Sequence, residues 1–304
     1  MKHLNPLMLL RIAQGDSYGM ACEYIKFPRD QAVLDEALRF ERYGRHPTHK
    51  LAPGQYTDDT QMSIAVTEVL MAMGPDWKSS FRVNEGAEDL RAQFANKFVE
   101  CFKRDQREGY SRGFQALLEQ VTDGRDLLAK INPDSDKNGA CMRAVPIGVL
   151  PDPMDVVAVA GIQARITHDT VGGQQSAILV AMMSHFALYH TEPFSYYPEW
   201  SAQYINVLPH DHDGPVVGPG VGLVTADAVY TLLDTETSLL GIARRTLQWG
   251  GDTDSVLAIA WGIASARHPG GDDLPPFFDG GLENGPYGHT FLLTMGRELM
   301  AKYQ

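Results

Sequence analysis

The chain has 304 residues, 44% hydrophobic and 21% charged, a composition that is typical of a globular protein with a large core. Its formal net charge of -12 argues against a protein that binds nucleic acid by neutralising phosphates. The apolar runs are shorter than the roughly 20 residues that span a bilayer, and the first is too short for a signal peptide, so we expect a cytoplasmic protein without membrane contact.

Helical patterns dominate the chain, whereas alternating polar and apolar residues are scarce. Between Met62 and Met73 the apolar residues recur at helical intervals, and the Gly-Pro pair that follows ends this helix. Nine further segments have helical character: residues 30–43, 86–104, 113–119, 154–167, 174–189, 226–233, 238–247, 254–267 and 290–303. These patterns predict an all-α fold, and because no composition break marks a linker, we expect a single domain over residues 1–304.

Proline and glycine cluster in two stretches, residues 191–222 and 268–288, which predict two long loops. The first loop contains four aromatic residues, Phe194, Tyr196, Tyr197 and Trp200. They fit either a pocket for a ring-shaped ligand or ordinary packing of the loop, and the second interpretation needs no ligand.

Two adjacent carboxylates, Asp58 and Asp59, come just before the apolar helix at Met62, in the segment YTDDTQ. One such residue would cap the helix, because aspartate accepts hydrogen bonds from free N–H groups and suits the helix dipole. A similar arrangement recurs at Asp252 and Asp254, in GGDTDS before the apolar run VLAIAWGIA. Capping explains one side chain at each helix, so the repeated pairs favour a shared site.

If the two helix starts meet in space, four carboxylates converge with the hydroxyls of Thr57 and Ser255. Such like charges repel one another unless a cation neutralises them. Ligands that are all oxygen favour Mg2+ or Mn2+ over zinc, and their number is sufficient for two ions. Asp252 and Asp254 are two positions apart, so a turn at the two glycines before them is needed to direct both at the ions.

Several motifs stand in an order that resembles the ADP-ribosylglycohydrolase family, which includes ADP-ribosylarginine hydrolases. They are GDSYG at residues 15–19 with Glu23 at the family's distance, TDDT at 57–60, NGACMR at 138–143, TH at 167–168 and GGDTDS at 250–255. Together they span nearly the whole chain. GDxxG alone would be weak evidence, whereas the two aspartate motifs combined with NGAxMR are specific.

The resemblance implies a cleft with two Mg2+ or Mn2+ ions that cleaves the bond between ADP-ribose and an acceptor. The implied metal ligands are Thr57, Asp58, Asp59, Asp252, Asp254 and Ser255, the last at a position where many relatives carry threonine. The implied catalytic residues are Glu23, Asp58, Asp59 and Asp252. The implied substrate-binding residues are Asn138, Gly139, Ala140, Met142 and His168.

Cleavage at C1 of the ribose passes through an oxocarbenium-like state. The ions would fix the ribose hydroxyls and lower the pKa of a bound water. Glu23 or one of the metal-binding aspartates would act as the general base, a choice that the sequence leaves open. We expect Asp16 to brace the site through hydrogen bonds to a backbone turn, and Arg143 to form a structural ion pair.

The sequence defines the acceptor less well than the metal site. The family often has NDP after TH, whereas residues 169–173 of this chain read DTVGG. The tail from residue 268 also departs from the family's pattern. We expect mono-ADP-ribosylated arginine on a protein. Serine-linked ADP-ribose, O-acetyl-ADP-ribose, small guanidino compounds and a non-catalytic ADP-ribose-binding protein are the alternatives. Isoprenoid synthases also bind Mg2+ through aspartate-rich helices, but DDTQM lacks the third aspartate of their DDxxD motif.

Overall fold

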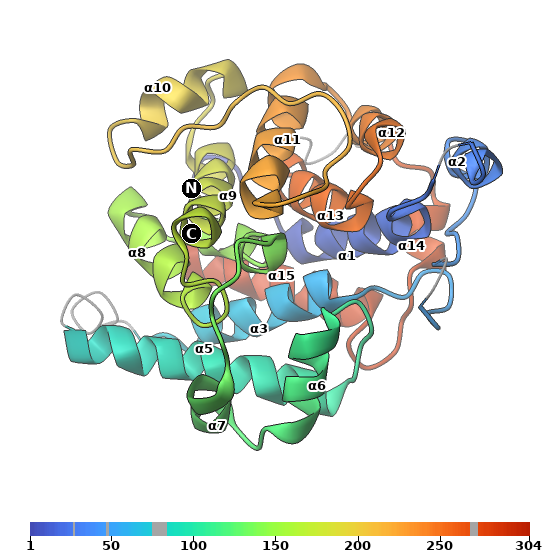
Figure 1. Ribbon diagram of the computed structural model, residues 1–304. Coiled ribbons are helices and arrows are strands. Elements are labelled where there is room, and N and C mark those ends of the chain that lie inside the picture. Colours follow the sequence, from blue (N-terminus) through green and yellow to red (C-terminus); the bar gives the residue numbers. More distant parts are fainter. Residues whose placement is uncertain (27, 47–48, 75–83, 268–272) are drawn as a thin grey trace.

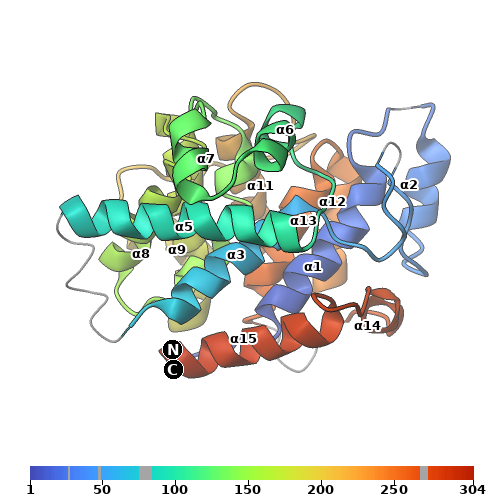
Figure 2. The same cartoon turned by 90° about the horizontal axis from the view of Figure 1, so that it is seen from below.

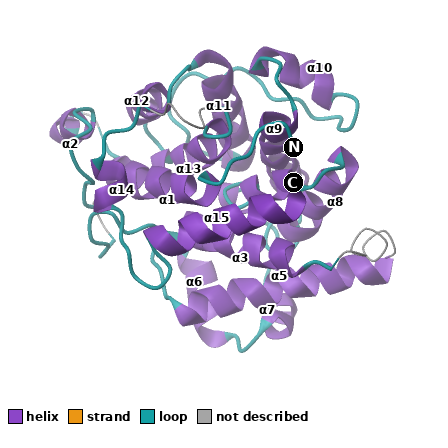
Figure 3. Ribbon diagram, turned by 180° about the vertical axis from the view of Figure 1, so that it is seen from behind, coloured by secondary structure: helices purple, strands orange, loops and turns teal. Residues whose placement is uncertain are grey.

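The computed structural model describes residues 1–26, 28–46, 49–74, 84–267 and 273–304. Within these ranges the chain consists of helices joined by loops, and its only strand-like pairing is an isolated bridge between Val216 and Gly251 (Figure 3). The predicted all-α fold is therefore confirmed. None of the helices in the same ranges has the length and apolar character that a bilayer-spanning segment needs.

The helices follow one another along the whole chain. The α-helices are α1 (Met8–Gly19), α2 (Gln31–Ala37), α3 (Asp58–Ala72), α5 (Asn84–Arg104), α6 (Arg112–Gln120), α7 (Gly124–Lys130), α8 (Pro153–Ala164), α9 (Val171–Tyr189), α10 (Tyr197–Ser201), α11 (Val221–Thr235), α12 (Leu239–Trp249), α13 (Thr253–Ala264), α14 (Phe277–Gly281) and α15 (His289–Tyr303). Short 3-10 helices are η1 (Met20–Cys22), η2 (Asn138–Ala140), η3 (Val145–Val149) and η4 (Phe194–Tyr196). Side chains of Asp123, Asp152, Thr170 and Ser238 fix the starts of α7, α8, α9 and α12 by accepting backbone N–H groups.

Helices α1 and α13 form the centre of the molecule, and all their residues are buried. They lie side by side in Figures 1 and 2. Two glycines of α1 make this contact possible. A Cβ at Gly15 would be 2.6 Å from Leu257 O, and one at Gly19 would be 2.5 Å from Thr253 O. Only residues without a side chain therefore allow the two backbones to approach so closely.

The other helices surround this pair. Helix α3 packs on α1 with α5 outside it, while α9 and α11 pack together against α13 (Figure 1). Helix α15 lies beneath α1 and α3 (Figure 2). The two ends of the chain lie close together beside α15 (Figure 1). Lys2 N donates to Leu188 O at 2.9 Å, and the Tyr303 hydroxyl donates to Leu70 O at 2.8 Å. Both termini are thus held against the helical core.

Each of the ten predicted helical segments contains a helix, with shifted ends. The segment 30–43 is the largest error, because α2 ends at Ala37 and Phe40 then adopts a φ of 52° that a helix cannot continue. Helices α1 and α7 were not predicted. The second half of α1 reads GDSYG, and because glycine, aspartate and serine have low helix propensity, its sequence does not resemble a helix.

The predicted loops contain short helices. Residues 191–222 include η4 and α10, and the described part of 268–288 includes α14, whereas residues 268–272 lie outside the described ranges. Phe194, Tyr197 and Trp200 are buried, and each has a ring contact with Phe186 of α9. Tyr196 is exposed. The aromatic residues therefore pack the loop onto the core, and the alternative of a ring-binding pocket is wrong for the buried three.

Buried His185 in α9 gives the fold a predictable dependence on pH. Its Nδ1–H donates to Leu150 O at 2.9 Å, and burial lowers its pKa from 6.5 to about 4. Between these values the unfolded chain binds more protons than the native protein, so the free energy of unfolding falls as pH drops from about 6.5 to 4. We expect His185→Gln to flatten this dependence, measured as the urea midpoint between pH 7 and pH 4.5.

The control for this experiment is His210→Gln, because the His210 side chain is 83% exposed. This variant should keep the slope of the wild-type protein. Equal slopes in wild type and His185→Gln would contradict the assignment of the pH dependence to His185.

Candidate metal centre

The starts of helices α3 and α13 meet at the carboxyl end of α1. Thr57 is the N-cap of α3 and Asp252 is the N-cap of α13. Helix α13 is fixed there because the Thr253 hydroxyl donates to Gly19 O at 2.8 Å. Helix N-termini have free N–H groups and a partial positive charge, so they favour carboxylates nearby. The two aspartate motifs thus lie together, as the sequence predicts.

Asp16 joins α1 to the start of α3. It accepts hydrogen bonds from the hydroxyls of Thr57 and Thr60, at 2.8 and 2.6 Å, and from the backbone N–H of both residues. Burial raises the pKa of Asp16 to about 6, and these hydrogen bonds act in the opposite direction. The predicted bracing role of Asp16 is confirmed.

Four buried aspartates face one another at this junction. Burial, and after it neighbouring carboxylates, raises the pKa of Asp58, Asp59 and Asp254 well above its usual range, and burial raises that of Asp252. Asp59 Oδ1 is buried without a hydrogen-bond partner among the described residues. Carboxylate oxygens of Glu23, Asp252 and Asp254 also lie within 4.8 Å of one another. Crowded oxygens with an unsatisfied buried acceptor fit a hard cation such as Mg2+ or Mn2+.

The predicted turn before Asp252 is present. Gly250 and Gly251 have φ values of 74° and 83°, which glycine adopts without strain. Val216 pairs with this turn: its N–H donates to Gly250 O at 3.2 Å, and its carbonyl accepts from Asp252 N at 3.0 Å. Asp252 therefore precedes the helix while Asp254 lies in its first turn, so both side chains reach the same site.

A cavity of about 850 Å³ opens over the carboxylates. The predicted site residues that line it are Glu23, Asp58, Asp59, Asn138, Gly139, Met142, His168, Asp252, Asp254 and Ser255. Two predicted residues lie behind the wall. Thr57 is buried and its hydroxyl hydrogen is donated to Asp16, so only its oxygen lone pairs remain for a metal. Ala140 is fully buried, and its carbonyl accepts from Gln163.

A chain of hydrogen bonds sets the tautomer of His168. Arg143 donates to the Thr167 hydroxyl at 2.9 Å. Among the described residues, the hydrogen of this hydroxyl has His168 Nδ1, 2.6 Å away, as its acceptor, which places the ring hydrogen on Nε2. Burial, with Arg143 and Lys137 nearby, lowers the pKa of His168 to about 3, so the ring is neutral. His168 therefore offers an Nε2–H donor.

The ion pair expected for Arg143 is wrong. Among the described residues its hydrogen-bond partners are Gln163 and Thr167, which are neutral, and its guanidinium lies 4.4 Å from the centre of the Phe98 ring. Burial lowers the pKa of Arg143 to about 9. The residue is structural as expected, but it acts through neutral groups.

Some residues of the cavity wall were not predicted: Tyr24, Tyr110, Phe114, Leu117, Lys130, Ile131 and Lys137. The spacing of Phe114 and Leu117 marks the apolar face of α6, and this pattern is the feature of the sequence that could have indicated these wall residues. The buried Nδ2 of Asn138 has no hydrogen-bond partner among the described residues. Apolar side chains, two lysines and an unused amide donor thus line the same cavity as the carboxylates.

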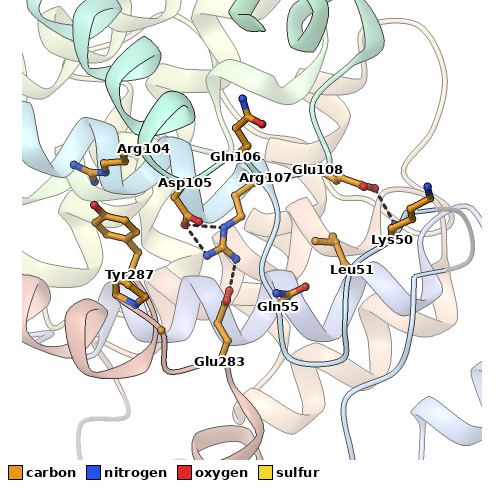
Figure 4. Close-up of a pocket in the computed structure, with 12 residues that line it drawn as sticks. Lys50, Leu51, Gln55, Arg104, Asp105, Gln106, Arg107, Glu108, Glu283 and Tyr287 are labelled. Atoms are coloured by element: carbon orange, nitrogen blue, oxygen red, sulfur yellow. Dashed lines mark hydrogen bonds and ion pairs between the residues drawn. The ribbon is translucent and has the colours of Figure 1, made fainter.

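A second cavity of about 360 Å³ is lined by residues of the 105–108 loop and by Glu283 and Tyr287 (Figure 4). Three of its charged side chains pair with one another. Arg107 lies between Asp105 and Glu283 and over the ring of Tyr56, 4.0 Å from its centre. The same loop continues to Gly109, where a Cβ would be 2.2 Å from Asp58 Oδ1. These ion pairs therefore hold the loop against the candidate metal centre.

Comparison with known proteins agrees with this geometry. A family model described as ADP-ribosylglycohydrolase matches residues 8–304. The chain therefore belongs to the ADP-ribosylglycohydrolase family, a family of hydrolases that act on the glycosyl bonds of ADP-ribose adducts. The alternative of an isoprenoid synthase is wrong.

The individual relatives differ in how much of the chain they cover. The ADP-ribosyl-dinitrogen reductase glycohydrolase of Rhodospirillum rubrum is 27% identical over 283 residues, which cover 88% of this chain and 85% of that protein. ADP-ribosylhydrolase ARH3 of Homo sapiens is 30% identical over 141 residues, 44% of this chain and 35% of that protein. A solved structure titled ADP-ribosylglycohydrolase-related protein complex has a TM-score of 0.70 and 19% identity, covering 99% of this chain and 98% of its own, and supports the fold.

The crowded carboxylates predict that a divalent ion stabilises the protein. An ion present at about 100 times its Kd adds about 2.7 kcal/mol, which corresponds to a rise in Tm of several degrees. We expect Mn2+ to raise the Tm of the wild type after chelator treatment, and Asp59→Asn to lose most of this rise. Without ions the Tm of Asp59→Asn should equal or exceed that of the wild type, because one buried charge is removed.

Asp35→Asn is the matched control, since Asp35 is an exposed carboxylate of α2. This variant should respond to Mn2+ like the wild type. An unchanged Mn2+ response in Asp59→Asn would exclude Asp59 as a ligand.

Proposed function

We propose that this protein removes ADP-ribose from mono-ADP-ribosylated arginine on a protein, with two divalent ions, Mg2+ or Mn2+, as cofactors. The main support is the convergence of the two aspartate motifs with Glu23 in one cavity of about 850 Å³. A cavity of this size is in the range of pockets that enclose a small-molecule ligand. ADP-ribose and the modified side chain would enter the cavity, while the rest of the acceptor protein would remain outside.

The residues that would hold the ions are Thr57, Asp58, Asp59, Asp252, Asp254 and Ser255. When bound, such ions supply Lewis acidity, which fixes the ribose hydroxyls and makes water a stronger nucleophile at neutral pH. The remaining work is done by side chains of this chain, which bind the substrate, orient it and transfer a proton.

The other lining residues of the cavity are suited to the rest of ADP-ribose. Phe114, Leu117 and Ile131 would cover the adenine ring with apolar surface. The unused Nδ2 of Asn138 and the Nε2–H of His168 would donate to the diphosphate. Gly139 supports this arrangement, because a Cβ there would be 2.8 Å from Cε1 of His168.

Glu23 is the general base in this proposal. Its side chain is 20% exposed and lines the cavity, whereas the aspartates are more deeply buried and would be engaged as ligands. Glu23 would accept a proton from the water that attacks C1 of the ribose. The C1–N bond breaks as the water adds, and its bonding electrons leave with the guanidine. Glu23 then returns the proton to this guanidine, so the step is balanced without any further reactant.

The charge of the cavity supports arginine as the acceptor. Its lining includes five carboxylates, those of Glu23, Asp58, Asp59, Asp252 and Asp254. Lys130, Lys137 and Arg143 are on the same lining, so the acidic character belongs to the carboxylate end of the cavity and not to the cavity as a whole. A guanidinium on C1 of the ribose would be attracted to the carboxylates at this end, whereas a serine oxygen or an acetyl group carries no positive charge.

Release of free ADP-ribose tests the proposal. We expect the pure protein to release it from an ADP-ribosyl-arginine peptide in the presence of Mg2+ or Mn2+, and chelator to stop the reaction, as followed by chromatography with mass detection. Asp252→Ala should lower turnover by at least about a hundredfold while circular dichroism stays that of the wild type. Asp35→Asn should keep full activity.

Parallel reactions with serine-linked peptide and O-acetyl-ADP-ribose identify the acceptor. Faster turnover of either would replace arginine but keep the metal-dependent reaction. If no adduct is cleaved and ADP-ribose still binds, the protein is an ADP-ribose-binding protein. Full activity of Asp252→Ala would exclude the mechanism with two metal ions.

A further inference from the structure

Two histidines lie beside Glu23, outside the motifs that mark the site. His46 Nε2 is 2.7 Å from Glu23 Oε2, and the centres of the His46 and His49 rings are 4.2 Å apart. The His46 side chain is only 4% exposed. A buried histidine in hydrogen-bond contact with the candidate base needs a chemical explanation.

A metal bound by Glu23, His46 and His49 is one explanation, because potential ligand atoms of the three residues lie within 4.8 Å of one another. The hydrogen bonds argue against it. His46 Nδ1 accepts the backbone N–H of His49 at 2.7 Å, so a neutral His46 ring carries its hydrogen on Nε2. That nitrogen then has no lone pair for a metal. It is instead a donor directed at the Glu23 carboxylate.

We propose that His46 is a positioning residue that holds Glu23 in the orientation needed for proton transfer. The inference rests on the proposed function, in which Glu23 is the general base. His46 Nε2–H binds Oε2 and leaves Oε1 of the same carboxylate for water. The backbone N–H of His49 selects the tautomer that makes this bond possible.

His49, whose backbone N–H binds His46, is itself anchored. Glu108 accepts from His49 Nδ1–H at 3.1 Å and from the backbone N–H of Lys50 at 2.9 Å, the second of which is drawn in Figure 4. Glu108 follows Arg107, whose ion pairs with Asp105 and Glu283 fix this part of the chain. The residue that binds His46 Nδ1 is therefore held in place by contacts of its own.

Glu23 needs such a partner because its surroundings are acidic. Asp252 and Asp254 have carboxylate oxygens within 4.8 Å of the Glu23 carboxylate, and their repulsion favours rotation of Glu23 away from the site. The backbone of the next residue is already fixed. Tyr24 has a φ of 49°, its N–H donates to Gly251 O at 2.8 Å, and its hydroxyl donates to Asp252 Oδ2 at 2.8 Å. These bonds hold the backbone, and His46 holds the carboxylate.

Three variants test the role of His46 in the full-length protein. His46→Leu removes the donor, whereas His46→Gln keeps an N–H donor close to the position of Nε2. We expect His46→Leu to lower kcat for ADP-ribosyl-arginine peptide by about tenfold to a hundredfold, with the Kd of ADP-ribose changed less than about twofold. His46→Gln should recover most of kcat, and His210→Leu, at an exposed histidine, should match the wild type.

A double-mutant cycle separates positioning from a general effect on the fold. If His46 acts through Glu23, adding His46→Leu to Glu23→Gln should cause no further loss of kcat. Additive losses, or a His46→Gln variant as slow as His46→Leu, would overturn the inference. Unchanged kcat in His46→Leu would overturn it as well.

Nitrogen-15 NMR of the histidine rings gives a readout that does not require turnover. We expect His46 in the Nε2–H tautomer, with faster exchange of this hydrogen in Glu23→Gln. An Nδ1–H tautomer would disprove the hydrogen bond even in an active enzyme. If the wild type cleaves no adduct, the proposed function fails, and with it the role of His46 in catalysis, while the ring spectrum still decides whether His46 orients Glu23.

Discussion

The close packing of α1 on α13 is the constraint on which the site depends. Gly15 and Gly19 bring the two backbones together, and Asp16 between them binds the start of α3 through Thr57 and Thr60. One turn of α1 thus fixes the starts of two helices that are almost 200 residues apart in sequence. A side chain at either glycine would need space that the backbone of α13 occupies, so the two pairs of aspartates would separate.

This arrangement places the acidic groups where helices accept them best. Asp58 and Asp59 are in the first turn of α3, and Asp254 is in the first turn of α13, so free N–H groups and the helix dipoles offset part of their repulsion. The offset is incomplete, because burial still raises the pKa of all three. The buried carboxylates therefore destabilise the protein locally. The large surrounding core offsets this destabilisation, and a bound cation would reduce it.

The sequence predicts the helices and the two aspartate motifs because each is a local pattern. It does not predict α1 as a helix, since the second half of this helix, GDSYG, is rich in residues with low helix propensity. The position of Ala140 behind the cavity wall and the neutral partners of Arg143 depend on packing between distant segments. His46 gave no signal either, because its contact with Glu23 is made by tertiary structure alone.

In the proposed function, two kinds of structure hold the reacting groups: the starts of central helices and contacts from loops. The ribose and its ions would be held at the starts of central helices, where the positions are set by backbone contacts that tolerate little change. Glu23 and Tyr24 follow the short helix η1, and they are held in place by contacts with His46 and Gly251. Loops accept changes in sequence more readily than packed helices do. In the proposed function, the contacts that hold the general base can therefore change more readily than the aspartates at the helix starts that would hold the ions.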